Sequence, residues 1–210
     1  MATSRDDIGV VILAGGLSRR LPGKLAMEVD GQPLLLRVCE NLARGRPAVV
    51  SCHDTLPPTL RASLPCPVVR DRFGRRGPLG GILSAIEHLQ NALVFVAAGD
   101  APFADASLID RLSALWREGD EALISVCRGQ AQPLASLYDR SALRREAPAL
   151  LHRSAGVRVA IAKLKHRLVD IEDERLFLDL DTPQDFGSLF GRAPMPPSTA
   201  DKRSAQAREV

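Results

Sequence analysis

The chain has 210 residues, of which 45% are hydrophobic but only 4% aromatic. This length suits one α/β domain. A core poor in aromatic side chains relies on Leu, Val, Ile and Ala, as in buried parallel strands covered by helices. The formal net charge is only +3, and residues 191–210 supply most of it with four basic and two acidic residues. Such a weak charge on the folded part argues against a nucleic-acid partner.

The four cysteines are spread along the chain without the close spacing of a zinc or redox motif. That spacing indicates reduced thiols in a cytoplasmic protein. The first seven residues, MATSRDD, contain no apolar signal region. No apolar run approaches the roughly 20 residues that a membrane span needs. We therefore expect a soluble cytoplasmic protein with neither a membrane nor a nucleic-acid partner.

Strands and helices are predicted to alternate through the first half of the chain. Strands are expected at 8–13, 48–52, 67–70 and 92–98, and helices over 33–44 and 79–89. Such alternation predicts right-handed βαβ crossovers and a mainly parallel sheet with helices on both faces.

The second half is predicted to add further strands and helices to the same domain. They are a helix over 107–117, strands at 121–126, 133–138 and 176–180, and a mainly helical region over 139–165. Asp105 or Ser107 is expected to cap the first of these helices, and Pro148 and Gly156 to break the helical region.

A last helix is predicted to begin after Thr182, with this residue as N-cap and Pro183 in the first helical position. Residues 1–190 are expected to form a single domain. Residues 191–210 are rich in Pro, Ser, Ala and charge, and we expect them to form a disordered tail.

The first predicted strand ends in the segment LAGGLSRRLPGK, residues 13–24. Gly15 and Gly16 let the backbone approach a ligand and turn its N–H groups toward it. Arg19 and Arg20 can bind phosphate oxygens through paired bonds, and Lys24 adds a compact charge. These groups suit a triphosphate and a departing pyrophosphate. The segment matches neither the Walker A nor the GxGxxG pattern, so a solvated basic loop is the alternative.

Aspartates follow two later predicted strands. Asp100 ends the most apolar one and can bind Mg²⁺, which takes one or two carboxylates together with phosphate and water. Asp179 and Asp181 alternate, so a strand here would turn both side chains to the same side. A second carboxylate would help to bridge the metal to a phosphate. Turn or cap roles are the alternative for all three.

Asp71 and the glycine-rich stretch 77–81, GPLGG, mark a third loop. A helix that begins after glycines favours anions and close approach of a ligand, and Gly77 opens this one. A carboxylate such as Asp71 can accept the N1–H and the 2-amino group of guanine, a pair of donors that adenine and cytosine lack. An exposed loop charge is the alternative. Because ligands bind beyond the carboxyl ends of parallel strands, we expect the three loops to converge.

Taken together, these motifs resemble the molybdenum cofactor guanylyltransferases over roughly residues 8–190. The matching stretches are LAGGLSRR at 13–20, DGQPLL at 30–35, Asp71 with GPLGGI at 77–82, DAP at 100–102, PLASLY at 133–138 and DLDTPQD at 179–185.

The resemblance implies a three-layer αβα sandwich, with a Rossmann-like, mainly parallel sheet of the nucleotide-diphospho-sugar transferase type. It implies transfer of GMP from GTP to the terminal phosphate of molybdopterin, with Mg²⁺ as cofactor and pyrophosphate as product. Transient contact with molybdoenzymes or cofactor-carrier proteins is also implied.

The motifs and the resemblance together assign roles to individual residues. Those expected to act in catalysis are Arg19, Lys24 and Asp100. Mg²⁺ is expected on Asp100 and Asp181. The expected nucleotide contacts are Leu13, Ala14, Gly15, Gly16, Lys24, Ser51, Asp71, Gly77 and Asp100, with Ser51 at the position where the family has a guanine-contacting Asn.

Departures from the family pattern leave open which nucleotide is the substrate. Gly23 precedes Lys24 where the family has Asp, and the ending RLPGK resembles the sugar-acid cytidylyltransferases. The final motif has Asp where guanylyltransferases have Asn, as in molybdopterin cytidylyltransferases. Transfer from CTP or another nucleotide to a related acceptor is therefore the second hypothesis. A nucleotide-binding accessory protein without catalysis is the third.

Overall fold

The structure is a computed structural model that describes residues 7–15, 20–53, 56–74, 76–152 and 156–191. The predicted site residues Gly16 and Arg19 lie outside the described residues, as do positions 192–210 of the predicted tail. Within the described ranges, no helix has the length and apolar character to cross a membrane.

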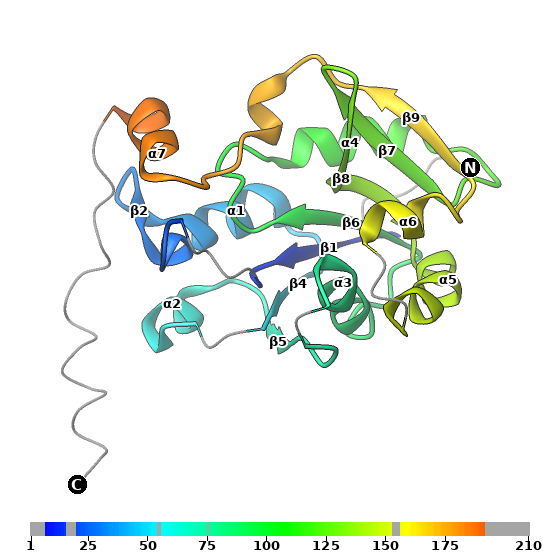
Figure 1. Ribbon diagram of the computed structural model, residues 1–210, viewed down its shortest axis with the longest axis horizontal. Coiled ribbons are helices and arrows are strands. Elements are labelled where there is room, and N and C mark those ends of the chain that lie inside the picture. Colours follow the sequence, from blue (N-terminus) through cyan, green and yellow to red (C-terminus); the bar gives the residue numbers. More distant parts are fainter. Residues whose placement is uncertain (1–6, 16–19, 54–55, 75, 153–155, 192–210) are drawn as a thin grey trace, which may run out of the picture.

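A seven-stranded sheet forms the middle layer of the protein, in the order β5-β4-β1-β6-β8-β7-β9 (Figure 1). Its strands are β1 (Ile8–Leu13), β4 (Ala48–Cys52), β5 (Val68–Arg70), β6 (Leu93–Ala98), β7 (Ala122–Cys127), β8 (Gln130–Asp139) and β9 (His166–Asp170). Only β8 runs against the others, because it pairs antiparallel with both β6 and β7. The predicted mainly parallel sheet is confirmed. A separate hairpin joins β2 (Glu28–Val29) and β3 (Gln32–Pro33).

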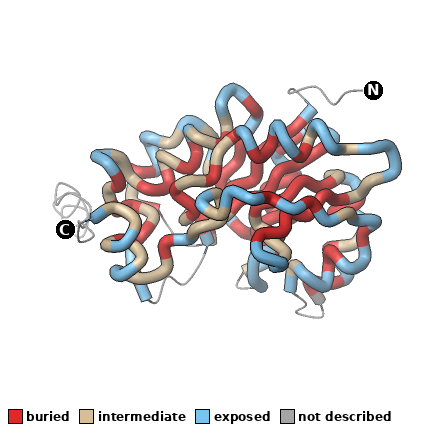
Figure 2. The backbone as a smooth tube through the Cα atoms, turned by 90° about the horizontal axis from the view of Figure 1, so that it is seen from above, coloured by how far each residue is buried: buried red, intermediate tan, exposed pale blue. Residues whose placement is uncertain are grey.

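Helices cover both faces of this sheet and complete the predicted αβα sandwich. One face carries α1 (Leu34–Ala43), α2 (Pro58–Ser63), α4 (Ala106–Leu115) and α7 (Pro183–Phe190), and the other carries α3 (Pro78–Ile86), α5 (Arg140–His152) and α6 (Val157–Ile161). Alternate side chains of β1 feed the two cores: Val10 and Ile12 join one, and Val11 joins the other. Figure 2 shows the buried residues gathered inside, with exposed residues along the outer turns.

The prediction of a strand at 176–180 is wrong. A short 3₁₀ helix, η3 (Glu174–Phe177), stands there instead, followed by an extended segment that does not join the sheet. The backbone N–H of Leu180 donates to the carbonyl of Asp100 at 2.9 Å, and the Leu180 side chain is fully buried. The alternation of apolar and polar residues therefore reflects one buried leucine in a connecting segment rather than a sheet face.

The strand β9, at the edge of the sheet, was missed by the sequence reasoning. Of its five residues only Val169 is buried, while Leu168 is 63% exposed. An edge strand with a single buried residue carries little of the apolar pattern by which strands are recognised.

Pro148 does not break the helical region as predicted, because α5 continues through it. A proline inside a helix removes one backbone hydrogen bond. Buried Ala147, Leu150 and Leu151 on either side of it pack into the core and stabilise the helix. The other two expectations are confirmed: Gly156 is the N-cap of α6, and Asp105 caps α4 by accepting the backbone N–H of Ser107.

Candidate functional site

The three loops singled out in the sequence converge at one edge of the sheet. The strand β1 lies between β4 and β6. At its end, the N–H of Ala14 donates to the Ser51 carbonyl at 2.8 Å, and the N–H of Gly99 donates to the Leu13 carbonyl at 2.9 Å. The strand β5 pairs parallel with β4 and brings Asp71 to the same edge. This is the edge at which open parallel sheets bind ligands.

A pocket with a volume of about 280 Å³ lies at this edge. Its described lining consists of Leu13, Ala14, Gly15, Arg20, Lys24, Leu25, Pro78, Ala98, Asp100, Leu134 and Asp181. The pocket therefore brings together the described residues expected to contact phosphate and both of those expected to bind the metal.

The charged side chains of the pocket meet at Lys24. Its Nζ donates to Asp100 Oδ2 and, at 2.9 Å, to Asp181 Oδ1. Burial is the largest influence on the Lys24 pKa and lowers it, but Asp100 and Asp181 together outweigh burial and raise this pKa above its ordinary value of 10.5. Lys24, which is only 8% exposed, is therefore a charged ammonium between two carboxylates.

The local backbone turns Lys24 inward. Lys24 begins a 3₁₀ helix, η2 (Lys24–Ala26), whose N-cap Gly23 has a φ of 73°. Glycine adopts this left-handed conformation without strain. The glycine that departs from the family pattern thus suits the turn that delivers the lysine to the pocket.

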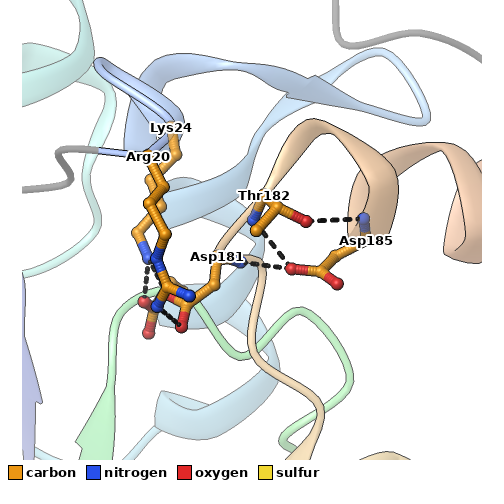
Figure 3. Close-up of polar contacts among 6 residues, drawn as sticks. Arg20, Lys24, Asp181, Thr182 and Asp185 are labelled. Atoms are coloured by element: carbon orange, nitrogen blue, oxygen red, sulfur yellow. Dashed lines mark hydrogen bonds and ion pairs between the residues drawn. The ribbon is translucent and has the colours of Figure 1, made fainter.

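Two further ionisable side chains, Arg20 and Asp179, lie near this bridge, and Figure 3 shows the first of them beside Lys24 and Asp181. Arg20 Nη2 donates to Asp181 Oδ2 at 2.7 Å, and the Arg20 side chain is 69% exposed. An ion pair so open to solvent adds little stability, so the guanidinium is available to a ligand. Although Asp179 is exposed, desolvation of its carboxyl group by nearby protein atoms, followed by the charges of Asp100 and Asp181, raises its pKa to about 7, and Lys24 opposes this shift. Asp179 thus belongs to the same cluster.

The start of α7 positions Asp181. Thr182 Oγ1 accepts the N–H of Asp185 at 3.1 Å, and Asp185 Oδ2 accepts the N–H of Thr182 at 2.7 Å and that of Asp181 at 3.1 Å (Figure 3). This is a capping box extended by one residue. It confirms the predicted N-cap and fixes the backbone of Asp181 from the helix side.

Asp100 and Asp181 fit a hard divalent cation. Within the described ranges, no group of three or more His, Cys, Asp or Glu side chains is placed to bind a metal without other ligands. Two carboxylates already share one cation, the ammonium of Lys24. Mg²⁺ uses such a pair and completes its shell with phosphate oxygens and water.

Ser51 and Asp71 lie beside the pocket rather than in its lining. A methyl group on Gly81 would lie 3.2 Å from Ser51 Oγ and 3.0 Å from Leu13 Cδ2, so the first turn of α3 packs against both residues. Ser51 Oγ is buried and has no hydrogen-bond partner among the residues that the structure describes. A polar group of a ligand would remove the free-energy cost of that unmet hydrogen bond. Gly77 is the N-cap of α3 and is also outside the lining.

Sequence reasoning assigned no site role to the apolar lining residues Leu25, Ala98 and Leu134. A signal existed for Leu134, which stands in the PLASLY stretch. Leu25 and Ala98 carry no motif of their own, but Leu25 lies next to Lys24 and Ala98 lies at the end of β6, close to Asp100.

A larger pocket of about 440 Å³ lies at the β5 edge of the sheet. Its described lining consists of Cys52, His53, Leu56, Arg61, Val68, Val69 and Arg70. This lining contains no predicted site residue and no carboxylate, so the smaller pocket is the candidate site.

The model of the MobA-like NTP transferase domain matches residues 10–168, which is most of the chain. The chain belongs to this family. Its class of reaction is therefore nucleotidyl transfer. The pocket around Lys24 lies beyond the carboxyl ends of the parallel strands, where open α/β sheets bind ligands.

Curated relatives of this MobA-like chain carry a more specific name. It is 30% identical to the molybdenum cofactor guanylyltransferase of Sinorhizobium fredii, over 83% of this chain and 86% of the relative. It is 31% identical to that of Cupriavidus metallidurans, over 85% of this chain and 92% of the relative.

Solved structures show the same fold. Molybdopterin-guanine dinucleotide biosynthesis protein A from Archaeoglobus fulgidus superposes with a TM-score of 0.75 at 24% identity, covering 87% of this chain and 97% of the other. A cytidylyltransferase from Leptospira borgpetersenii superposes with a TM-score of 0.66 at 20% identity, covering 87% and 84%. Transferases with different names share this fold. The fold therefore does not identify the nucleotide substrate, which depends on the residues of the site.

Replacing Asp185 by Asn tests how α7 supports the site of this MobA-like chain. We expect the free energy of unfolding to fall by about 0.3–1 kcal/mol at neutral pH, because the variant keeps an acceptor oxygen but loses the negative charge at the helix N-terminus. Hydrogen bonds from Thr182 lower the pKa of Asp185 below its ordinary value of 3.8. The advantage of the wild type should therefore be complete above that pH and disappear as the pH falls below it.

Urea unfolding of both proteins across this pH range measures the effect. Equal stabilities at neutral pH would show that the negative charge of Asp185 adds nothing to the capping box. A difference that persists unchanged in acid would show that the Asp185 carboxylate is not its source.

Proposed function

We propose that this protein transfers GMP from GTP to the terminal phosphate of molybdopterin and releases pyrophosphate, with Mg²⁺ as cofactor. The observation that carries the proposal is the Lys24 ammonium, which is bound between Asp100 and Asp181 in the pocket at the ligand edge. The relatives at 30% and 31% identity that are named molybdenum cofactor guanylyltransferase support these substrates.

The triphosphate of GTP would bind to the loop after β1. Leu13, Ala14 and Gly15 line the pocket, together with the cationic residues Arg20 and Lys24. A triphosphate would offer phosphate oxygens to Lys24 in place of the two carboxylates. Arg20 is exposed enough to turn from Asp181 to the same phosphates. Arg19, which lies outside the described residues, keeps its predicted role in this loop.

The reaction would be an in-line displacement at the α-phosphorus. An oxygen of the acceptor's terminal phosphate forms the new P–O bond. The bond from the α-phosphorus to the bridging oxygen of the β-phosphate breaks, and pyrophosphate leaves with the electron pair. Lys24 and Arg20 stabilise the negative charge that develops on the leaving group. Mg²⁺ bound to Asp100 and Asp181 would neutralise phosphoryl charge and orient the oxygens.

The base would bind beside this pocket, at Ser51 and Asp71. Within the described part of the chain the buried Ser51 hydroxyl has no hydrogen-bond partner, and the Asp71 carboxylate lies in the same region against α3. The guanine edge offers a carboxylate two adjacent donors. We place the enzyme in the cytoplasm, with transient contact to molybdoenzymes or cofactor-carrier proteins that receive the product.

Thermal denaturation with GTP, CTP, ATP and UTP, each with and without Mg²⁺, tests the nucleotide. At 100 times its dissociation constant a ligand should stabilise the protein by about 2.7 kcal/mol. We expect this effect for GTP with Mg²⁺ and a much smaller one for the other three. Stabilisation by CTP alone would favour cytidylyl transfer. Stabilisation by GTP without release of pyrophosphate in the presence of acceptor would favour an accessory protein.

Replacing Lys24 by Met tests the phosphate contact. We expect the dissociation constant for GTP to rise by about tenfold or more, because a charge-assisted bond to phosphate is lost. Isothermal titration calorimetry on the folded variant measures this. Lys163→Met is the matched control, since Lys163 is exposed and does not line the pocket. An unchanged affinity in Lys24→Met would remove this lysine from the triphosphate site.

A further inference from the structure

One oxygen of the Asp71 carboxylate is already used by the protein. The backbone N–H of Phe73 donates to Asp71 Oδ1 at 2.9 Å, and Ser84 Oγ lies 3.3 Å from the same atom. No residue in the described ranges donates to Asp71 Oδ2. Because the side chain is only 9% exposed, its orientation is set by these contacts. Oδ2 is therefore the oxygen available to a ligand.

Ser84 is at the centre of this arrangement. It lies on α3, is 1% exposed, and its Oγ accepts the backbone N–H of Arg72 at 3.0 Å. The hydroxyl has one hydrogen and two acceptors within reach, the Gly80 carbonyl at 2.9 Å and Asp71 Oδ1 at 3.3 Å. Ser84 thus links α3 to the backbone of Arg72 and to the Asp71 carboxylate.

Close packing of α3 confines the same carboxylate. A methyl group on Gly80 would lie 3.2 Å and 3.3 Å from the two oxygens of Asp71, and 3.1 Å from Phe73 Cβ. Few real contacts of a Cβ atom are as close. Glycine at this position lets the helix backbone approach the carboxylate, so Ser84 can reach it from the next turn.

We propose that Ser84 is a positioning residue, which fixes Asp71 so that Oδ2 faces the base of the nucleotide. This inference rests on the proposed function, in which Asp71 reads the base. Oδ1 has two lone pairs, and the Phe73 N–H and the Ser84 hydroxyl can occupy both. The guanine donors then meet an oxygen with a fixed direction, and selection of the base depends on Ser84.

A purely structural role for Ser84 would lower stability without changing base selection. Ser136 is a matched control for that role. It is fully buried, and its Oγ accepts the N–H of Ser125 at 3.0 Å and donates to the Gln132 carbonyl at 2.6 Å. It makes the same kinds of bond on β8, among residues that do not contact Asp71.

The test is the ratio of the dissociation constants for ITP and GTP, measured by calorimetry in the presence of Mg²⁺. ITP retains the N1–H of guanine but lacks the 2-amino group. We expect the wild type to prefer GTP, Ser84→Ala to reduce the ratio by about fivefold, and Ser136→Ala to leave it unchanged. An unchanged ratio in Ser84→Ala would overturn the positioning role.

Gly80→Ala is the second variant, because the added methyl group would lie 3.2 Å and 3.3 Å from the two carboxylate oxygens and so displace them while the Ser84 side chain is retained. It should reduce the same ratio, and an unchanged ratio would again overturn the inference if Ser84→Ala does not fold.

The wild-type measurement tests the proposed function separately. A preference for CTP would overturn guanylyl transfer, and Ser84 would then be judged by the ratio for UTP and CTP, since cytosine has an amino donor that uracil lacks. No preference for any base would overturn both.

Discussion

The bridge from Lys24 to Asp100 and Asp181 is the interaction on which the candidate site depends. It joins the loop after β1, the end of β6 and the start of α7, segments that lie far apart in the sequence. Each partner is fixed by its own local structure. Gly23 turns the lysine inward, the central strand delivers Asp100, and the capping box supports Asp181.

The bridge also imposes an energetic constraint. Bringing two carboxylates together is unfavourable unless a cation lies between them, and a charge with little access to water is costly unless it is paired. The lysine meets both conditions while no other cation is bound. In the proposed function, the phosphates of the nucleotide and the metal ion would supply the same charges in another arrangement.

Much of the fold could be predicted from the sequence because its strongest signals are local. The runs 8–13 and 92–98 are almost wholly apolar, and they became the central strands β1 and β6. Asp100 could be singled out because it directly follows the second run. Thr182 and Pro183 carry the cap chemistry of a helix start in their own side chains.

The errors have tertiary causes. The segment at 176–180 alternates like a strand, but its backbone bonds to Asp100 rather than to a sheet edge. The strand β9 buries only Val169 and so lacks a local pattern. The pairing of Lys24 with two aspartates depends on how distant loops pack together, and no local sequence pattern predicts that packing. In the sequence Ser84 is an ordinary helix residue, and only the structure shows that it lies beside Asp71.

The central claim is that the Lys24 ammonium occupies the position between two carboxylates where a divalent cation would bind. Electron paramagnetic resonance titration with Mn²⁺, without nucleotide, tests it most directly by comparing the wild type with Lys24→Met. The account predicts that the variant binds Mn²⁺ more tightly by about tenfold or more, because a competing charge a few ångströms away has been removed. Equal or weaker binding by the variant would contradict it.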